Sequence, residues 1–104
     1  IDRFGTIERG DPAFVAQAFM KTMNVDRVAT RQLLLSVQDV PAEAIAKVTM
    51  PTLVVCGAED GDNGSAPALA EALPDGHYAE VPGNHMSSVT RSEFGEAIAR
   101  FLAA

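Results

Sequence analysis

Apolar residues in the first part of the chain recur at four-residue steps, a spacing that places one stripe along a helix. The steps are formed first by Val15, Phe19 and Met23, and then by Ala29, Leu33 and Val37. We therefore expect a helix over residues 12–23 that buries its stripe, and a second helix over residues 29–37.

Polar residues and prolines mark the beginnings of these helices. Asp11 followed by Pro12 combines a side-chain acceptor with the residue favoured in a first helical turn. Asn24 or Asp26 can cap the second helix, and Pro41 opens a third, short one.

The pattern changes after Pro51. Residues 52–56 form an apolar, β-branched run without polar alternation, which is typical of a strand covered on both faces. A loop over 57–65, a short helix over 67–73 and a second strand over 77–81 follow. Thr90 and Glu93 have the spacing of a capping box before a final helix. That helix carries its apolar face on Phe94, Ala97, Ile98, Phe101 and Leu102.

The alternation of strands and helices predicts the α/β class, with two parallel strands and flanking helices. The organisation is then a helical segment over 1–40, followed by a strand–helix–strand–helix part over 41–104.

Composition excludes several classes of protein. Apolar residues make up 47% and charged residues 21% of the 104 positions, as in ordinary globular proteins. The net charge of −6 argues against nucleic acid and anionic membranes as partners. Cys56 is the only cysteine, so no internal disulfide forms. The longest apolar run is too short to cross a bilayer, and no secretory leader precedes it, which favours the cytoplasm. Because the chain opens on Ile1, we expect that a segment upstream has been removed.

Two loops follow the carboxyl ends of the expected strands, where open parallel sheets bind ligands. The first carries Glu59, Asp60 and Asp62, and the second carries His85. A carboxylate bonded to one imidazole nitrogen leaves the other free to take a proton from a nucleophile. The simpler interpretation is that the acidic residues form a turn or a cap and that the histidine is merely exposed. A calcium loop is disfavoured, because the spaced ligands and the closing Glu are missing.

The segment from Ile45 to the end resembles the C-terminal portion of α/β-hydrolases. Ile45 to Asp60 matches the pattern I-x-x-V-x-x-P-x-L-V-V-x-G-x-x-D, and Ala70 to Pro74 matches A-x-x-L-P. Pro82, Gly83 and His85 match P-G-x-x-H in looser spacing, and Phe101-Leu102 closes the last helix as in the family.

The resemblance implies that Asp60 is the acid of a catalytic triad and His85 its general base, in the family's order Ser, Asp, His. Asp62 and Glu59 are rival acids. The helices of residues 1–40 would be the end of a cap, or the helices that follow it. Neither a cofactor nor a metal is implied.

The nucleophile of that family is missing, since no G-x-S-x-G occurs. Ser65 is expected to cap a helix, and Ser87 and Ser88 lie just past His85 without a strand–turn–helix to present them. We therefore expect a C-terminal fragment of a hydrolase that acts on esters or related carbonyl compounds and is inactive alone. Dehalogenase, carbon–carbon hydrolase or haloperoxidase chemistry and a non-catalytic packing fragment are the alternatives. Expected partners are a small-molecule substrate and either the missing N-terminal part or a second copy, covering the sheet edge.

Overall fold

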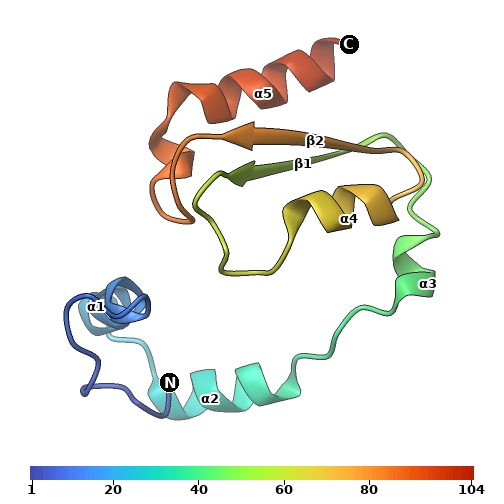
Figure 1. The fold of residues 1–104 in the computed structure, drawn as a ribbon. Helices are drawn as coiled ribbons and strands as arrows, with labels where there is room; N and C mark the ends of the chain where they lie inside the picture. Colours follow the sequence, from blue (N-terminus) through green and yellow to red (C-terminus); the bar gives the residue numbers. More distant parts are fainter. The chain divides into compact units, whose positions relative to one another are not determined.

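The computed structural model describes residues 1–104 as two compact units, Ile1–Asp39 and Val40–Ala104 (Figure 1). The first unit contains helices α1 (Phe14–Thr22) and α2 (Arg27–Ser36). Asp26 caps α2, because its carboxylate accepts hydrogen bonds from the backbone N–H groups of Val28 at 2.9 Å and Ala29 at 3.0 Å. This cap is one of the two that the sequence offered.

A glutamine holds the N-terminal loop against α1. Gln17 is 5% exposed, and its Oε1 accepts from the backbone N–H of Gly5 at 2.7 Å. Its Nε2 donates to the carbonyl of Ile7 at 3.0 Å. The buried amide is therefore satisfied on both sides, as a buried polar group must be.

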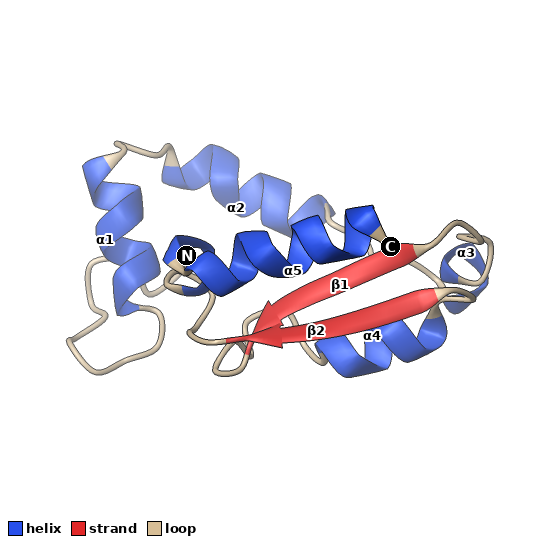
Figure 2. Ribbon diagram, turned by 90° about the horizontal axis from the view of Figure 1, so that it is seen from above, coloured by secondary structure: helices blue, strands red, loops and turns tan.

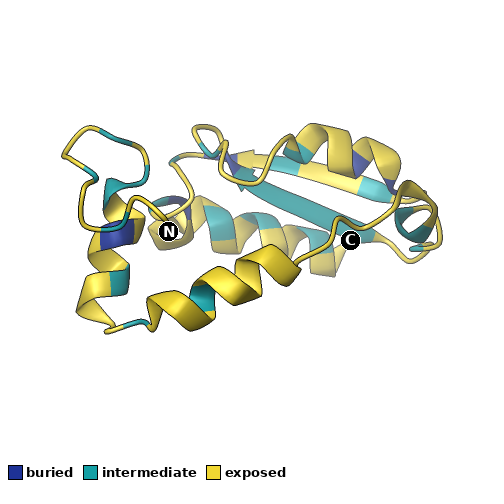
Figure 3. Ribbon diagram, turned by 90° about the horizontal axis from the view of Figure 1, so that it is seen from below, coloured by how far each residue is buried: buried dark blue, intermediate teal, exposed yellow.

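The expected burial of the first apolar stripe is wrong. Val15 is 54% exposed, Phe19 53% and Met23 60%, whereas Gln17 occupies the buried position of the helix. Figure 3 shows the prevalence of exposed surface on both helices. The four-residue spacing identifies the helix correctly, but it does not identify the face that the helix buries within its unit.

The second unit is a small α/β fold. The short helix α3 (Ala42–Ile45) leads into a two-stranded parallel sheet that pairs Thr52 with Gly76 and Gly57 with Val81. Its elements are β1 (Thr52–Gly57), α4 (Ala66–Ala72), β2 (Gly76–Val81), the 3₁₀ turn η1 (Ser88–Thr90) and α5 (Ser92–Ala103). Helices α4 and α5 cover opposite faces of the sheet (Figures 1 and 2). The expected α/β class with two parallel strands is confirmed.

The core of this unit is small. Ala70, Leu73 and Val81 are its buried apolar side chains, at 8%, 9% and 4% exposure. The apolar residues of β1 are only half-buried, although their pattern predicted a fully covered strand. Each strand has one partner, so each also leaves one edge without a neighbouring strand.

The capping box expected at the start of the last helix does not form. Helix α5 begins at Ser92 without a side-chain cap, because the Thr90 hydroxyl instead donates to the Ser87 carbonyl at 2.7 Å in the 3₁₀ turn. Phe94, Ala97 and Phe101 are half-buried on the expected face, whereas Leu102 is exposed. No helix combines the length and the apolar character that spanning a bilayer requires.

Close packing at the start of β2 yields a test of the fold. A Cβ atom on Gly76 would overlap the carbonyl oxygen of Ala70 and approach Leu73 Cβ to 3.0 Å. Overpacking of this kind costs about 1–3 kcal/mol. We expect Gly76→Ala to lower the free energy of unfolding by about 1–3 kcal/mol and so to lower the urea midpoint, as measured by circular dichroism.

The matched control is Gly61→Ala, because a Cβ there meets no atom within 4 Å. Its unfolding free energy should stay within about 0.5 kcal/mol of the parent chain. Equal midpoints for the two variants would contradict the packing of α4 against β2.

Candidate functional site

The two loops that carry the candidate residues leave the sheet at the same level. Gly57 and Val81 are in register at the carboxyl ends of β1 and β2. The contact continues past the strands, since Ala58 N–H donates to the Val81 carbonyl at 2.7 Å and Glu59 N–H to the Gly83 carbonyl at 3.0 Å. The loops are therefore joined by backbone hydrogen bonds before either reaches its functional side chain.

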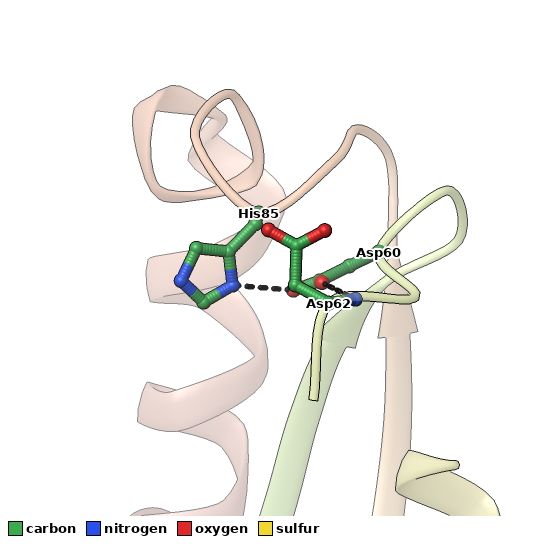
Figure 4. Close-up of side chains that lie close together, drawn as sticks. All are labelled: Asp60, Asp62 and His85. Atoms are coloured by element: carbon green, nitrogen blue, oxygen red, sulfur yellow. Dashed lines mark hydrogen bonds and ion pairs between the residues drawn. The ribbon is translucent and has the colours of Figure 1, made fainter. Parts of the chain in front are cut away.

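Asp60 and His85 meet above this junction. Asp60 Oδ2 lies 3.0 Å from His85 Nδ1. In Figure 4 the Nδ1 edge of the imidazole faces Asp60, and the other ring nitrogen points away. The Asp60 side chain is 13% exposed and that of His85 49%, so the carboxylate lies inside and the imidazole outside.

Short-range hydrogen bonds hold Asp60 in this position. Its backbone N–H donates to the Gly57 carbonyl at 3.0 Å, and its Oδ1 accepts from the Asp62 N–H at 3.1 Å. The Cys56 thiol is directed at the Asp60 carbonyl, with Sγ 3.8 Å from the oxygen. One carboxylate oxygen is thus engaged by the loop, and the other is left for His85.

The electrostatics of the pair follow from these contacts. The N–H of Asp62, and then the imidazole of His85, lower the pKa of Asp60 below its usual 3.8. The carboxylate of Asp60 raises the pKa of His85 above 6.5, and the charge of Asp62 adds to the effect. Because an ionised carboxylate only accepts hydrogen bonds, Nδ1 carries the proton. In the neutral ring Nε2 then has a free lone pair, which is the arrangement that a general base needs.

The rival acids occupy different places. Asp62 contributes a carboxylate to a group in which ligand-type atoms of Asp60, Asp62 and His85 lie within 4.8 Å of one another. Such a group could hold a cation, but Asp60 Oδ2 and His85 Nδ1 already bond to each other. We therefore interpret the group as the Asp60–His85 pair with the Asp62 carboxylate beside it. Glu59 makes no hydrogen bond to His85.

A shallow pocket of about 510 Å³ lies beside the pair. Glu59, Glu80, Ser87 and Arg91 give it polar walls, and the loop after β2 forms its floor. Neither Asp60 nor His85 lines it, so it is a neighbour of the acid–histidine pair and does not enclose it.

The serines of the chain are engaged elsewhere. Ser65 Oγ accepts from Ala68 N–H at 3.2 Å and caps α4, as expected from the sequence. Ser88 is 3% exposed, and Ser87 Oγ bonds within its own loop. No serine hydroxyl is hydrogen-bonded to His85, and the Cys56 thiol is directed at the Asp60 carbonyl, not at the imidazole.

The sequence pattern did not predict the hydrogen bonds that close the loop containing His85. Asn84 Oδ1 accepts from the backbone N–H groups of Met86 and Ser87, each at 3.0 Å. The available signal was the Asn itself, because an Asn side chain in a loop commonly bonds to the backbone N–H two residues on.

Comparisons with protein-family models, with curated proteins and with solved structures found no match to this chain.

The pKa directions make the stability of the pair depend on pH. The contribution of His85 is present below pH 6.5 and is lost as pH rises through its raised pKa. That of Asp60 is present above pH 3.8 and is lost as pH falls through its lowered pKa. We expect Asp60→Asn to destabilise the chain more at about pH 5.5 than at about pH 9, measured by urea unfolding.

Asp62→Asn serves as the comparison, because the Asp62 side chain makes no hydrogen bond to His85. Its effect should be the smaller of the two at about pH 5.5. The same loss for both variants at both pH values would count against the Asp60–His85 pair.

Proposed function

We propose that this chain supplies the acid and the histidine of an α/β-hydrolase-type active site, with a serine that lies outside these 104 residues. The observation that carries the proposal is the 3.0 Å contact between Asp60 Oδ2 and His85 Nδ1 at the carboxyl ends of two parallel strands. The reaction is the hydrolysis of an ester or a related carbonyl compound.

In this mechanism His85 Nε2 takes the proton of the serine hydroxyl while the serine oxygen attacks the carbonyl carbon. The tetrahedral intermediate then collapses and its bond to the alkoxide breaks, while the protonated imidazole gives its proton to that oxygen. The alcohol leaves, and the acyl group remains on the serine. Water repeats the sequence, releasing the acid and restoring the serine. Asp60 stays ionised throughout and orients the ring through Nδ1.

The half-buried strand β1 supports the proposal that a further strand pairs with the sheet. The apolar run of β1 is half-buried and has a strand on one side only. Such a strand suits a position inside a wider sheet, where another strand pairs with its open edge. We propose that the remainder of the same protein, or a second copy of the chain, supplies it. The unit Ile1–Asp39 is then the end of a cap or the helices that follow it.

A non-catalytic packing fragment is the second candidate, and it is favoured because no serine hydroxyl is hydrogen-bonded to His85. The two functions differ in what a longer protein should do. A hydrolase gains activity when the serine is restored, whereas a packing fragment gains none. Dehalogenase, carbon–carbon hydrolase and haloperoxidase chemistry would use the same pair with a different nucleophile or substrate.

The chain alone should be inactive. Without a nucleophile and oxyanion donors most of the catalytic advantage is lost. We expect its hydrolysis of p-nitrophenyl acetate to equal that of the His85→Ala variant. Turnover by the chain that His85→Ala abolishes would contradict this expectation.

The decisive experiment extends the chain upstream in its own gene, until a G-x-S-x-G is included, and measures ester hydrolysis and fluorophosphonate labelling. His85→Ala should lower kcat by about 10⁶-fold and Asp60→Asn by about 10⁴-fold. His77→Ala is the matched control, because His77 also pairs with a carboxylate, that of Asp75 at 2.9 Å.

The control should keep nearly full activity, since His77 lies at the start of β2 and the proposed site lies at its end. Equal losses for His77→Ala and His85→Ala would contradict the proposed role of His85. An extended protein that contains the motif and neither hydrolyses esters nor takes the label would favour the packing fragment.

A further inference from the structure

The side chains of Asn84 and Ser87 close the loop that carries His85. Asn84 Oδ1 accepts three hydrogen bonds, from Met86 N–H at 3.0 Å, Ser87 N–H at 3.0 Å and Ser87 Oγ at 3.1 Å. In return the Asn84 N–H lies 2.9 Å from Ser87 Oγ. His85 and Met86 lie in the loop between these two residues, and we call the closed loop the Asn84–Ser87 ring.

The ring is anchored to the rest of the site. Ser88 N–H donates to the Asn84 carbonyl at 2.9 Å, and Ser88 is 3% exposed. Gly83, directly before the ring, has φ +105°, and a Cβ there would meet Ser87 Oγ at 2.6 Å. The chain therefore reverses sharply at a residue where only glycine fits, and the ring fixes the direction in which it continues.

His85 needs such support because its own backbone N–H and carbonyl take no part in the backbone hydrogen bonds of the loop. Its side chain is 49% exposed, and its hydrogen bond to Asp60 is its one side-chain interaction of this kind. A half-exposed imidazole on a free loop samples many rotamers, and each one away from Asp60 loses the hydrogen bond. Fixing the backbone at 84 to 87 reduces that freedom without adding a contact to the ring nitrogens.

We propose that Asn84 is a positioning residue, which acts through the Asn84–Ser87 ring to hold His85 Nδ1 against Asp60. This inference deepens the proposed function and rests on it, since it names a residue that sets the geometry of the general base. Asn84 touches neither imidazole nitrogen, so it takes no part in proton transfer.

The test titrates both histidines of the full chain by NMR, in the parent and in matched variants. Asp60 and Asp62, both from the loop after β1, are the charged groups that face His85. Asn84→Ala removes the acceptor. Asn84→Ser restores a neutral oxygen that can bond to the same backbone amides.

We expect the pKa of His85 to lie above 6.5 in the parent and to fall toward 6.5 in Asn84→Ala, whereas Asn84→Ser keeps it raised. Ser87→Ala should give an intermediate value, because two of the three hydrogen bonds to Asn84 Oδ1 remain. His77 is the internal control, since it pairs with Asp75 and lies 5.5 Å from the ring of Phe101. The NMR signals of its ring should be the same in the parent and in every variant.

Each other outcome overturns a definite part of the account. A raised pKa of His85 that Asn84→Ala leaves unchanged would overturn the positioning role alone. A change in His77 that accompanies the change in His85 would show that Asn84 supports the fold in general, which also overturns the positioning role. A parent chain in which the pKa of His85 is not raised would contradict the pair itself, and with it the proposed function.

Discussion

The site depends on the in-register parallel pairing of β1 with β2. Because Gly57 stands opposite Val81, the two strands end at the same level and their loops leave side by side. The fit at this point is tight: a Cβ on Gly57 would approach the Gly83 carbonyl carbon to 2.9 Å and Ser88 Cβ to 3.1 Å. A side chain at position 57 would therefore force the junction of the two loops to shift.

The two members of the pair differ in how they are held. Asp60 is nearly enclosed and is bonded through its own loop, which keeps its carboxylate ionised and fixed. His85 is half-exposed and reaches Asp60 from a loop that Asn84 and Ser87 close. The Asp60 carboxylate is therefore the fixed partner of the hydrogen bond, and the His85 imidazole is the partner that solvent or a substrate can reach. The attraction between a carboxylate and an imidazole is stronger where water is excluded.

The sequence predicts those features of the chain that depend on local pattern. The run from Thr52, bounded by Pro51 and Gly57, indicates a strand. Because the loops after parallel strands lie at the same edge of the sheet, the sequence also predicts that Asp60 and His85 lie close together. The features that the sequence does not predict depend on contacts between residues that are far apart along the chain. The stripe of Val15 is a correct helix pattern but not the buried face of the helix, and the buried amide of Gln17 binds a loop whose course no periodicity reveals.

The central claim is that Asp60 holds the imidazole of His85 through Nδ1, and the tautomer of the neutral ring tests it most directly. Nitrogen-15 spectra of the histidine side chains, recorded above the pKa of His85, separate the two tautomers. We predict that the proton of His85 is on Nδ1, with Nε2 unprotonated and free to accept. A proton on Nε2 would mean that Nδ1 does not donate to Asp60, and would contradict the account.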